Sequence, residues 1–137
     1  MPGLNERSIK NLSGCHKDMQ IICATAIERI GFTVIHGYVN EANQESRRRS
    51  GASPFVFGKS KHNKKPAMAI DFIPNPFNGD WKDLKPFVAV AHVFIAVAEE
   101  LYAAGVITHT IRWGHDWDRD GIEGEKGEWD TDHVELI

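Results

Sequence analysis

The sequence has few of the features that mark secreted, membrane or disulfide-stabilised proteins. Its 137 residues include only two cysteines, Cys15 and Cys23, and on one helix these would lie about 12 Å apart, too far for a mutual disulfide. No basic N-terminus leads into an apolar run, and no stretch approaches the roughly 18 apolar residues of a membrane span. We therefore expect free thiols, no membrane segment, and a protein that is made in the cytoplasm and initially stays there.

Acidic residues are missing from the segment 47–65, although the chain as a whole has a formal net charge of −3. Attraction of an acidic ligand and plain solvation of a surface loop both remain open for this segment. Nucleic acid is not an expected partner, because the chain is net negative and only Phe55 and Phe57 are available there to stack on bases. The basic side chains of the segment are Arg47, Arg48, Arg49, Lys59, Lys61, Lys64 and Lys65.

The composition that is present, 42% apolar and 26% charged residues, fits one soluble globular domain, which we expect to be a monomer. Apolar spacing predicts a helix over residues 15–30 ended by Gly31, and Asn40 can cap a polar helix that ends at Gly51. A long apolar helix, capped by Asp80 or Asp83, should end at Gly105. Strands are predicted at residues 32–37, 67–73, 110–114 and 132–136.

These elements predict an α+β fold in which helices pack on a small, mostly antiparallel sheet. Candidate metal ligands are His62, Asp71 and His133, which we expect at the sheet edge and in its loops. Two imidazoles and a carboxylate suit zinc and leave a fourth position open, as in catalytic sites. Seven histidines offer many such triples, however, so composition alone does not select this one. Glu135 shares a strand face with His133 and can orient a ligand.

Short sequence motifs surround these residues. They are Gly14-Cys15-His16-Lys17-Asp18, Ser60-x-His62, Ala69-x-Asp71, Trp113-Gly114-His115-Asp116-Trp117, and Asp130 three residues before His133-x-Glu135. In these motifs the chain resembles the zinc peptidoglycan-peptidase family of bacterial D-alanyl-D-alanine carboxypeptidases and phage L-alanyl-D-glutamate endopeptidases. The resemblance runs along nearly the whole chain and is closest to single-domain phage endolysins. It implies a zinc peptidase catalytic domain over residues 1–137, a peptidoglycan substrate, His62, Asp71 and His133 as metal ligands, and Asp130 as the catalytic base.

The chain departs from the family pattern at Val39, where an arginine often helps to hold the substrate carbonyl or carboxylate. Its replacement could be Arg47, Arg48, Lys59 or Lys61; Ser60, Lys61 and Arg47 are the candidate substrate-binding residues. A carboxypeptidase must hold a terminal carboxylate, so this loss favours an L-alanyl-D-glutamate endopeptidase for host cell lysis, acting on the wall after release. D-Alanyl-D-alanine carboxypeptidase activity and a non-catalytic zinc-containing wall-binding module remain alternatives.

A second cation is suggested by Asp116, Asp118, Asp120 and Gly121, which match the first half of a calcium loop. Position twelve should be a glutamate and is Gly127, although Glu123, Glu125 or Glu128 could complete a non-standard site. Ca2+ and an ordinary solvated acidic loop both remain open. Of the other histidines, His36 is expected to be a strand residue that could point at the site, and His92 a structural residue.

Overall fold

The computed structural model describes residues 3–125 and 129–137. Its four strands form one sheet in the order β1-β2-β4-β3, and every strand pair is antiparallel. The predicted α+β fold with a single domain is confirmed. The elements in chain order are α1 (Glu6–Leu12), α2 (Lys17–Ala26), β1 (Phe32–His36), α3 (Glu41–Ser50), the 3₁₀ helix η1 (Lys61–Asn63), β2 (Ala69–Pro74), α4 (Lys85–Ala103), β3 (Ile111–Gly114) and β4 (Asp130–Leu136).

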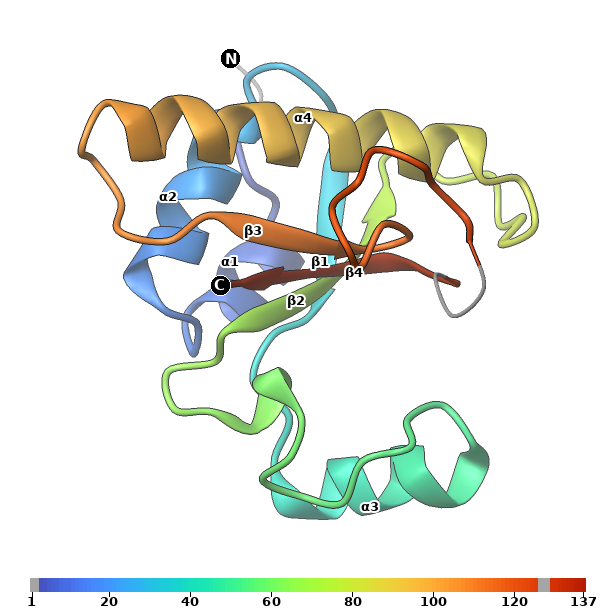
Figure 1. Ribbon diagram of the computed structural model, residues 1–137. Helices are drawn as coiled ribbons and strands as arrows, with labels where there is room; N and C mark the ends of the chain where they lie inside the picture. Colours follow the sequence, from blue (N-terminus) through green and yellow to red (C-terminus); the bar gives the residue numbers. More distant parts are fainter. Residues whose placement is uncertain (1–2, 126–128) are drawn as a thin grey trace.

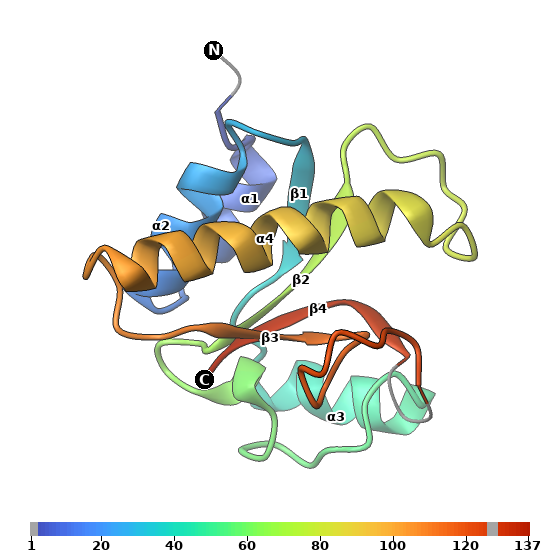
Figure 2. The same cartoon turned by 45° about the horizontal axis from the view of Figure 1, so that its top comes forward.

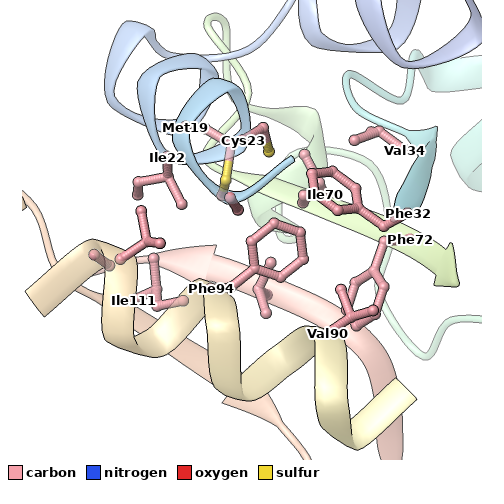
Figure 3. Close-up of a cluster of buried hydrophobic side chains, with 14 of the residues drawn as sticks. Met19, Ile22, Cys23, Phe32, Val34, Ile70, Phe72, Val90, Phe94 and Ile111 are labelled. Atoms are coloured by element: carbon pink, nitrogen blue, oxygen red, sulfur yellow. The ribbon is translucent and has the colours of Figure 1, made fainter. Parts of the chain in front are cut away.

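The sheet separates two layers of helices. Helix α4 crosses one face together with α2, whereas α3 lies on the other side of the sheet, as both views show (Figures 1 and 2). Within the core, Phe94 of α4 packs edge-on against Phe32 and Phe72, with ring centroids 4.7 and 5.2 Å apart (Figure 3). Edge-to-face packing of this kind adds to the free energy gained from burying the rings. The core therefore lies between α2, α4 and the sheet, away from α3.

Helix α4 is the one helix in the described residues whose length and composition would suit a membrane span. It has 19 residues, and its buried side chains face the sheet and α2. Core helices of globular domains have the same properties, so α4 is weak support for a membrane segment. The buried residues are Phe87, Val90, Ala91, Phe94, Val97 and Ala98.

The ends of the helices test the capping predictions. Asn40 caps α3 by accepting a hydrogen bond from the Asn43 backbone, and Gly51 ends the helix with a φ of 82°. Both predictions are confirmed, because a left-handed residue after a helix favours glycine. The predicted cap of α4 is wrong, because Leu84 occupies the N-cap and makes no side-chain cap. Asp80 accepts from the Lys82 backbone, and Asp83 makes a long contact of 3.4 Å with the backbone N–H of Lys85, the first residue of the helix.

Helix α2 is shorter than predicted and ends at Ala26, with Ile27 rather than Gly31 at its C-cap. Cys15 precedes the helix instead of lying on it. Both cysteines are buried and free, as expected, and burial raises the pKa of the Cys15 thiol to about 12. These thiols are therefore protonated packing residues rather than nucleophiles.

Candidate active site

Three predicted ligands, far apart in the sequence, meet at one point. The Nε2 atom of His62 and the Nδ1 atom of His133 lie 3.3 Å apart, and each lies 3.2 Å from Oδ1 of Asp71. All three residues are buried. Asp71 and His133 face each other across β2 and β4, the two central strands of the sheet, so the expectation of a site at the sheet edge is wrong.

His62 is held by the short helix η1 and by the end of β1. The Ser60 hydroxyl accepts from the His62 backbone N–H, and Asn63 completes a capping box with Ser60. His62 Nδ1 lies 2.8 Å from the Gly37 carbonyl oxygen. A side chain at Gly37 would place Cβ only 2.1 Å from the Asn11 carbonyl oxygen, so this approach requires glycine. The predicted Ser60 thus acts here as a cap.

The hydrogen bonds around the two histidines assign their tautomers. A carbonyl oxygen only accepts, so His62 Nδ1 bears the hydrogen and Nε2 presents a lone pair to Asp71. His133 Nε2 lies 2.9 Å from the Glu135 carboxylate, which leaves the Nδ1 lone pair facing Asp71 as well. When both rings are neutral, two lone pairs and a carboxylate oxygen therefore converge with no hydrogen between them. Such an arrangement needs a positive charge at its centre.

A metal ion fits this need. Tetrahedral ligands at the usual zinc distances lie about 3.4 Å from one another, close to the edges of the observed triangle. Burial raises the pKa of Asp71, but the charge of His62 and hydrogen bonds with the neighbouring histidines hold it well below the ordinary value. Burial lowers the pKa of His133, yet hydrogen bonds to Asp71 and Glu135 outweigh this and raise it to about 10. Without a metal, the His133 ring is therefore protonated at neutral pH, and a metal ion can take the place of this extra proton between the ligand atoms.

Glu135 is placed to orient the His133 ring, as predicted, and two cationic side chains contact its carboxylate. Arg112 Nη2 donates to Glu135 Oε2 at 2.7 Å, and Lys61 Nζ is 3.3 Å from the same oxygen. Burial raises the pKa of Glu135, but hydrogen bonds from His133 and Arg112 dominate and lower it to about 2. Glu135 is therefore an anion at neutral pH and keeps the His133 ring in one orientation.

Asp130, the predicted base, lies at the mouth of the cluster. Its Oδ2 is 3.9 Å from His133 Nδ1, and its side chain is 31% exposed, so it can reach a water beside the ligands. Gly114 allows this placement, because a Cβ there would lie 2.2 Å from the Asp130 carbonyl oxygen. Asp132 was not predicted as a site residue, and its carboxyl group forms a hydrogen bond with that of Asp130. Burial and the charge of Asp71 raise the pKa of Asp132 to about 8.

A cleft of about 380 Å³ opens beside these residues between α3 and the sheet. Its walls include the predicted Arg47, Ser60 and Lys61. Trp117 of the family segment also lines the cleft, as do Arg112 and Trp129, which were not predicted as site residues. The other proposed replacements for the family arginine are absent from the cleft lining. Arg48 instead pairs with Glu45 on the exposed side of α3, and Lys59 lies exposed in the loop before η1. Arg47 is thus the cation of α3 that reaches the site.

His36 also reaches the site. Its Nδ1 lies 3.1 Å from Oδ2 of Asp71, the oxygen that does not face the two buried histidines. Arg47 Nη2 lies 3.4 Å from the same oxygen. His36 and Arg47 therefore steady the carboxylate of Asp71 from outside, while Oδ1 remains directed at the centre of the cluster.

The predicted calcium residues Asp116, Asp118 and Asp120 also lie together, with carboxylate oxygens within 4.8 Å of one another. Asp116 Oδ2 accepts from the Gly121 backbone, so part of the cluster already bonds within its own loop. Gly127 and Glu128 lie outside the described residues. His92, predicted to be structural, contacts Glu123 at the edge of this loop and packs against Trp113.

Comparison with known proteins gives two positive findings. The chain is similar in fold to a crystal structure of the L-Ala D-Glu endopeptidase ChiX of Serratia marcescens, with 22% sequence identity and a TM-score of 0.72. That match covers 96% of this chain and 87% of the other. A search of curated proteins found no match. Because a family profile matches residues 3–137, the chain belongs to the phage L-alanyl-D-glutamate peptidase family.

Proposed function

We propose that this protein is a zinc-dependent endopeptidase that hydrolyses the bond between L-alanine and D-glutamate in the peptide stems of bacterial peptidoglycan. The observation that carries the proposal is the buried triangle of His62, Asp71 and His133, whose free lone pairs converge at distances suited to zinc. The choice of the L-alanyl-D-glutamate bond as the one that is cut rests on membership of the family. The protein would be made in the cytoplasm and act as an endolysin, as a monomer, once it reaches the wall.

The chain's own residues perform the remaining steps. When bound, zinc would supply Lewis acidity toward the scissile carbonyl and a lowered pKa for the attacking water. Asp130 takes the proton of that water and then delivers it to the leaving amine of D-glutamate. Glu135 keeps the His133 ring fixed, and the Gly37 carbonyl does the same for His62. The cleft beside them holds the extended stem peptide.

Digestion of purified muropeptides by the zinc-loaded protein, followed by mass spectrometry of the new termini, tests the proposal. We expect a new C-terminal L-alanine and a new N-terminal D-glutamate. Metal-stripped protein serves as the control and should leave the muropeptides intact. Release of free D-alanine as the main product would show a carboxypeptidase instead, and equal cleavage by stripped protein would remove the role of zinc.

A further inference from the structure

Among the described residues, three cationic side chains line the cleft beside the metal cluster, and they differ in how fully they are paired. Lys61 contacts Glu135 and the Leu136 carbonyl. Arg112 donates to Glu135 at 2.7 Å and lies over the Trp117 ring, 5.2 Å from its centroid, although its Nε is buried with no hydrogen-bond partner among the described residues. These two side chains are therefore occupied in holding the carboxylate that orients His133.

Arg47 is much less occupied. Among the described residues it contacts Asp71 Oδ2, at 3.4 Å, and that oxygen also bonds with His36 at 3.1 Å. Its Nη1 is buried and has no hydrogen-bond partner in the part of the chain that the structure describes. A guanidinium has five N–H donors, so one long contact leaves most of its capacity unused. Among the described residues, Arg47 is the cleft cation that does not hold Glu135 and has most of its donors available for a ligand.

The position of Arg47 restricts what that ligand can be. Its guanidinium lies beside Asp71, so it is placed to meet the part of a bound substrate within a few bonds of the scissile carbonyl. The nearby lining from α3 and the following loop, Ala52, Ser53, Pro54 and Phe55, has no charge that would compete with a ligand anion. A planar fork of N–H groups in such a place matches a carboxylate.

The substrate has such a carboxylate at that distance. A glutamate residue has two carboxyl groups, of which one continues the stem and the other stays outside the chain. Cleavage before D-glutamate puts this free group on the residue that supplies the leaving amine. We propose that Arg47 binds this carboxylate and thereby makes the enzyme selective for stems whose glutamate is a free acid rather than an amide. The inference rests on the proposed function, because it names the substrate chemistry of the same cleft.

Two synthetic stem peptides that differ only at this group, free acid against primary amide, test the inference with the zinc-loaded full chain. The wild-type protein should favour the free acid by about tenfold or more in kcat/KM, since a charge-assisted hydrogen bond is replaced by a neutral one. Arg47→Gln should bring the ratio of the two kcat/KM values close to one. Arg47→Lys, which keeps the charge but loses the fork, should retain part of the preference.

Arg48→Gln is the matched control, because Arg48 is the next residue on α3 and its guanidinium is exposed and paired with Glu45. That variant should keep the wild-type ratio. If Arg47 only supported the fold or Asp71, Arg47→Gln would slow cleavage of both peptides equally and leave the ratio unchanged, which would overturn the inference. Equal cleavage of both peptides by the wild type would overturn it too. Failure to cleave either peptide would instead overturn the proposed function, and this inference with it.

Discussion

Two clusters in this molecule contain a histidine, an aspartate and a second histidine, and they differ in what their atoms face. In the first, His62, Asp71 and His133 direct free lone pairs at one point. In the second, made of His16, Asp18 and His109, the carboxylate oxygen Oδ2 of Asp18 already accepts from His109 Nδ1 at 2.6 Å and from the Thr108 backbone at 3.0 Å.

In the second cluster, the imidazole of His16 is also hydrogen-bonded within the protein. His16 Nδ1 accepts a hydrogen bond from the Asp18 backbone at 2.9 Å and thereby caps α2. The cluster therefore joins the start of α2 to the segment before β3, and its lone pairs are satisfied by protein donors. The comparison shows that ligand type and proximity do not define a metal centre. Unpaired acceptors that converge do, because only they gain from a cation.

Removing one histidine from each cluster in turn should give the largest difference between the two clusters in zinc content and activity. His133→Ala opens the triangle and leaves two ligands, so zinc and activity should both fall to background. His109→Ala is the matched control and should keep zinc and turnover, because its ring bonds only to protein groups. Elemental analysis and a muropeptide assay on both variants measure this. A zinc-free His109→Ala protein would reverse the assignment of the two clusters.

Asp130→Asn should give the next largest effect, since it removes the base and keeps the ligands. Turnover should drop roughly a hundredfold or more, while zinc content and fold remain unchanged. Steady-state kinetics and elemental analysis on the same preparation check both halves. If turnover barely changes, another acid is the base, and Glu135 and Glu128 are the candidates to replace next.

Glu135→Gln should have a smaller effect, because it keeps the shape but loses the anion that orients His133. Zinc affinity should fall about ten- to hundredfold, as competition with a chelator can measure. Glu123→Gln is a matched control, since Glu123 contacts His92 outside the triangle. Equal affinities in the two variants would show that the Glu135 charge has no part in holding the metal.

Asp18→Asn should affect stability and leave the zinc site intact. Burial raises the pKa of Asp18, but hydrogen bonds from His109 and Thr108 outweigh it, so the folded-state pKa lies below the ordinary 3.8. The stabilisation is therefore full above pH 3.8 and is lost as the pH falls through the lowered pKa. We expect a loss of about 1–3 kcal/mol at neutral pH, which shrinks in acid. Urea unfolding at two pH values measures it; a pH-independent loss would contradict this origin.

The smallest effect is expected at the acidic loop, where calcium binding remains a prediction. An ion held by Asp116, Asp118 and Asp120 would order the segment before Asp130 and His133. Calorimetric titration of calcium into zinc-loaded protein, with Asp118→Ala as the control, tests this. No heat at millimolar calcium would identify the cluster as an ordinary solvated loop.

Local patterns accounted for the parts of the fold that are stabilised locally. Asn40 and Gly51 marked the ends of α3 because a cap and a left-handed residue leave a signature in the sequence. Helix α1 was not predicted, although Asn5 caps it by accepting a hydrogen bond from the Ser8 backbone. It has only seven residues, and long-range bonds also hold it: the Val34 N–H donates to the Ser8 hydroxyl at 2.9 Å, and Asn11 donates to the Val34 carbonyl at 2.8 Å.

The site likewise contains residues that local sequence motifs predict and contacts that they do not. His62, Asp71, His133 and Asp130 were named from motifs, because the chemistry requires those residue types at those positions. The partnership of Arg112 with Glu135 depends on the register of β3 against β4, which pairs these two residues directly. The reach of Arg47 to Asp71 depends on how α3 packs. Neither spacing nor composition contains that information, because both contacts join segments whose relative placement only the folded chain defines.

Zinc titration into metal-stripped protein, with cleavage of an L-alanyl-D-glutamate stem peptide followed in the same samples, tests the central claim most directly. Cleavage should rise in proportion to added zinc and reach its plateau at about one ion per chain. The His109→Ala variant should give the same curve, and His133→Ala should stay at background throughout. Full activity in the stripped protein, before any zinc is added, would contradict the assignment of the His62, Asp71 and His133 triangle as the catalytic metal centre.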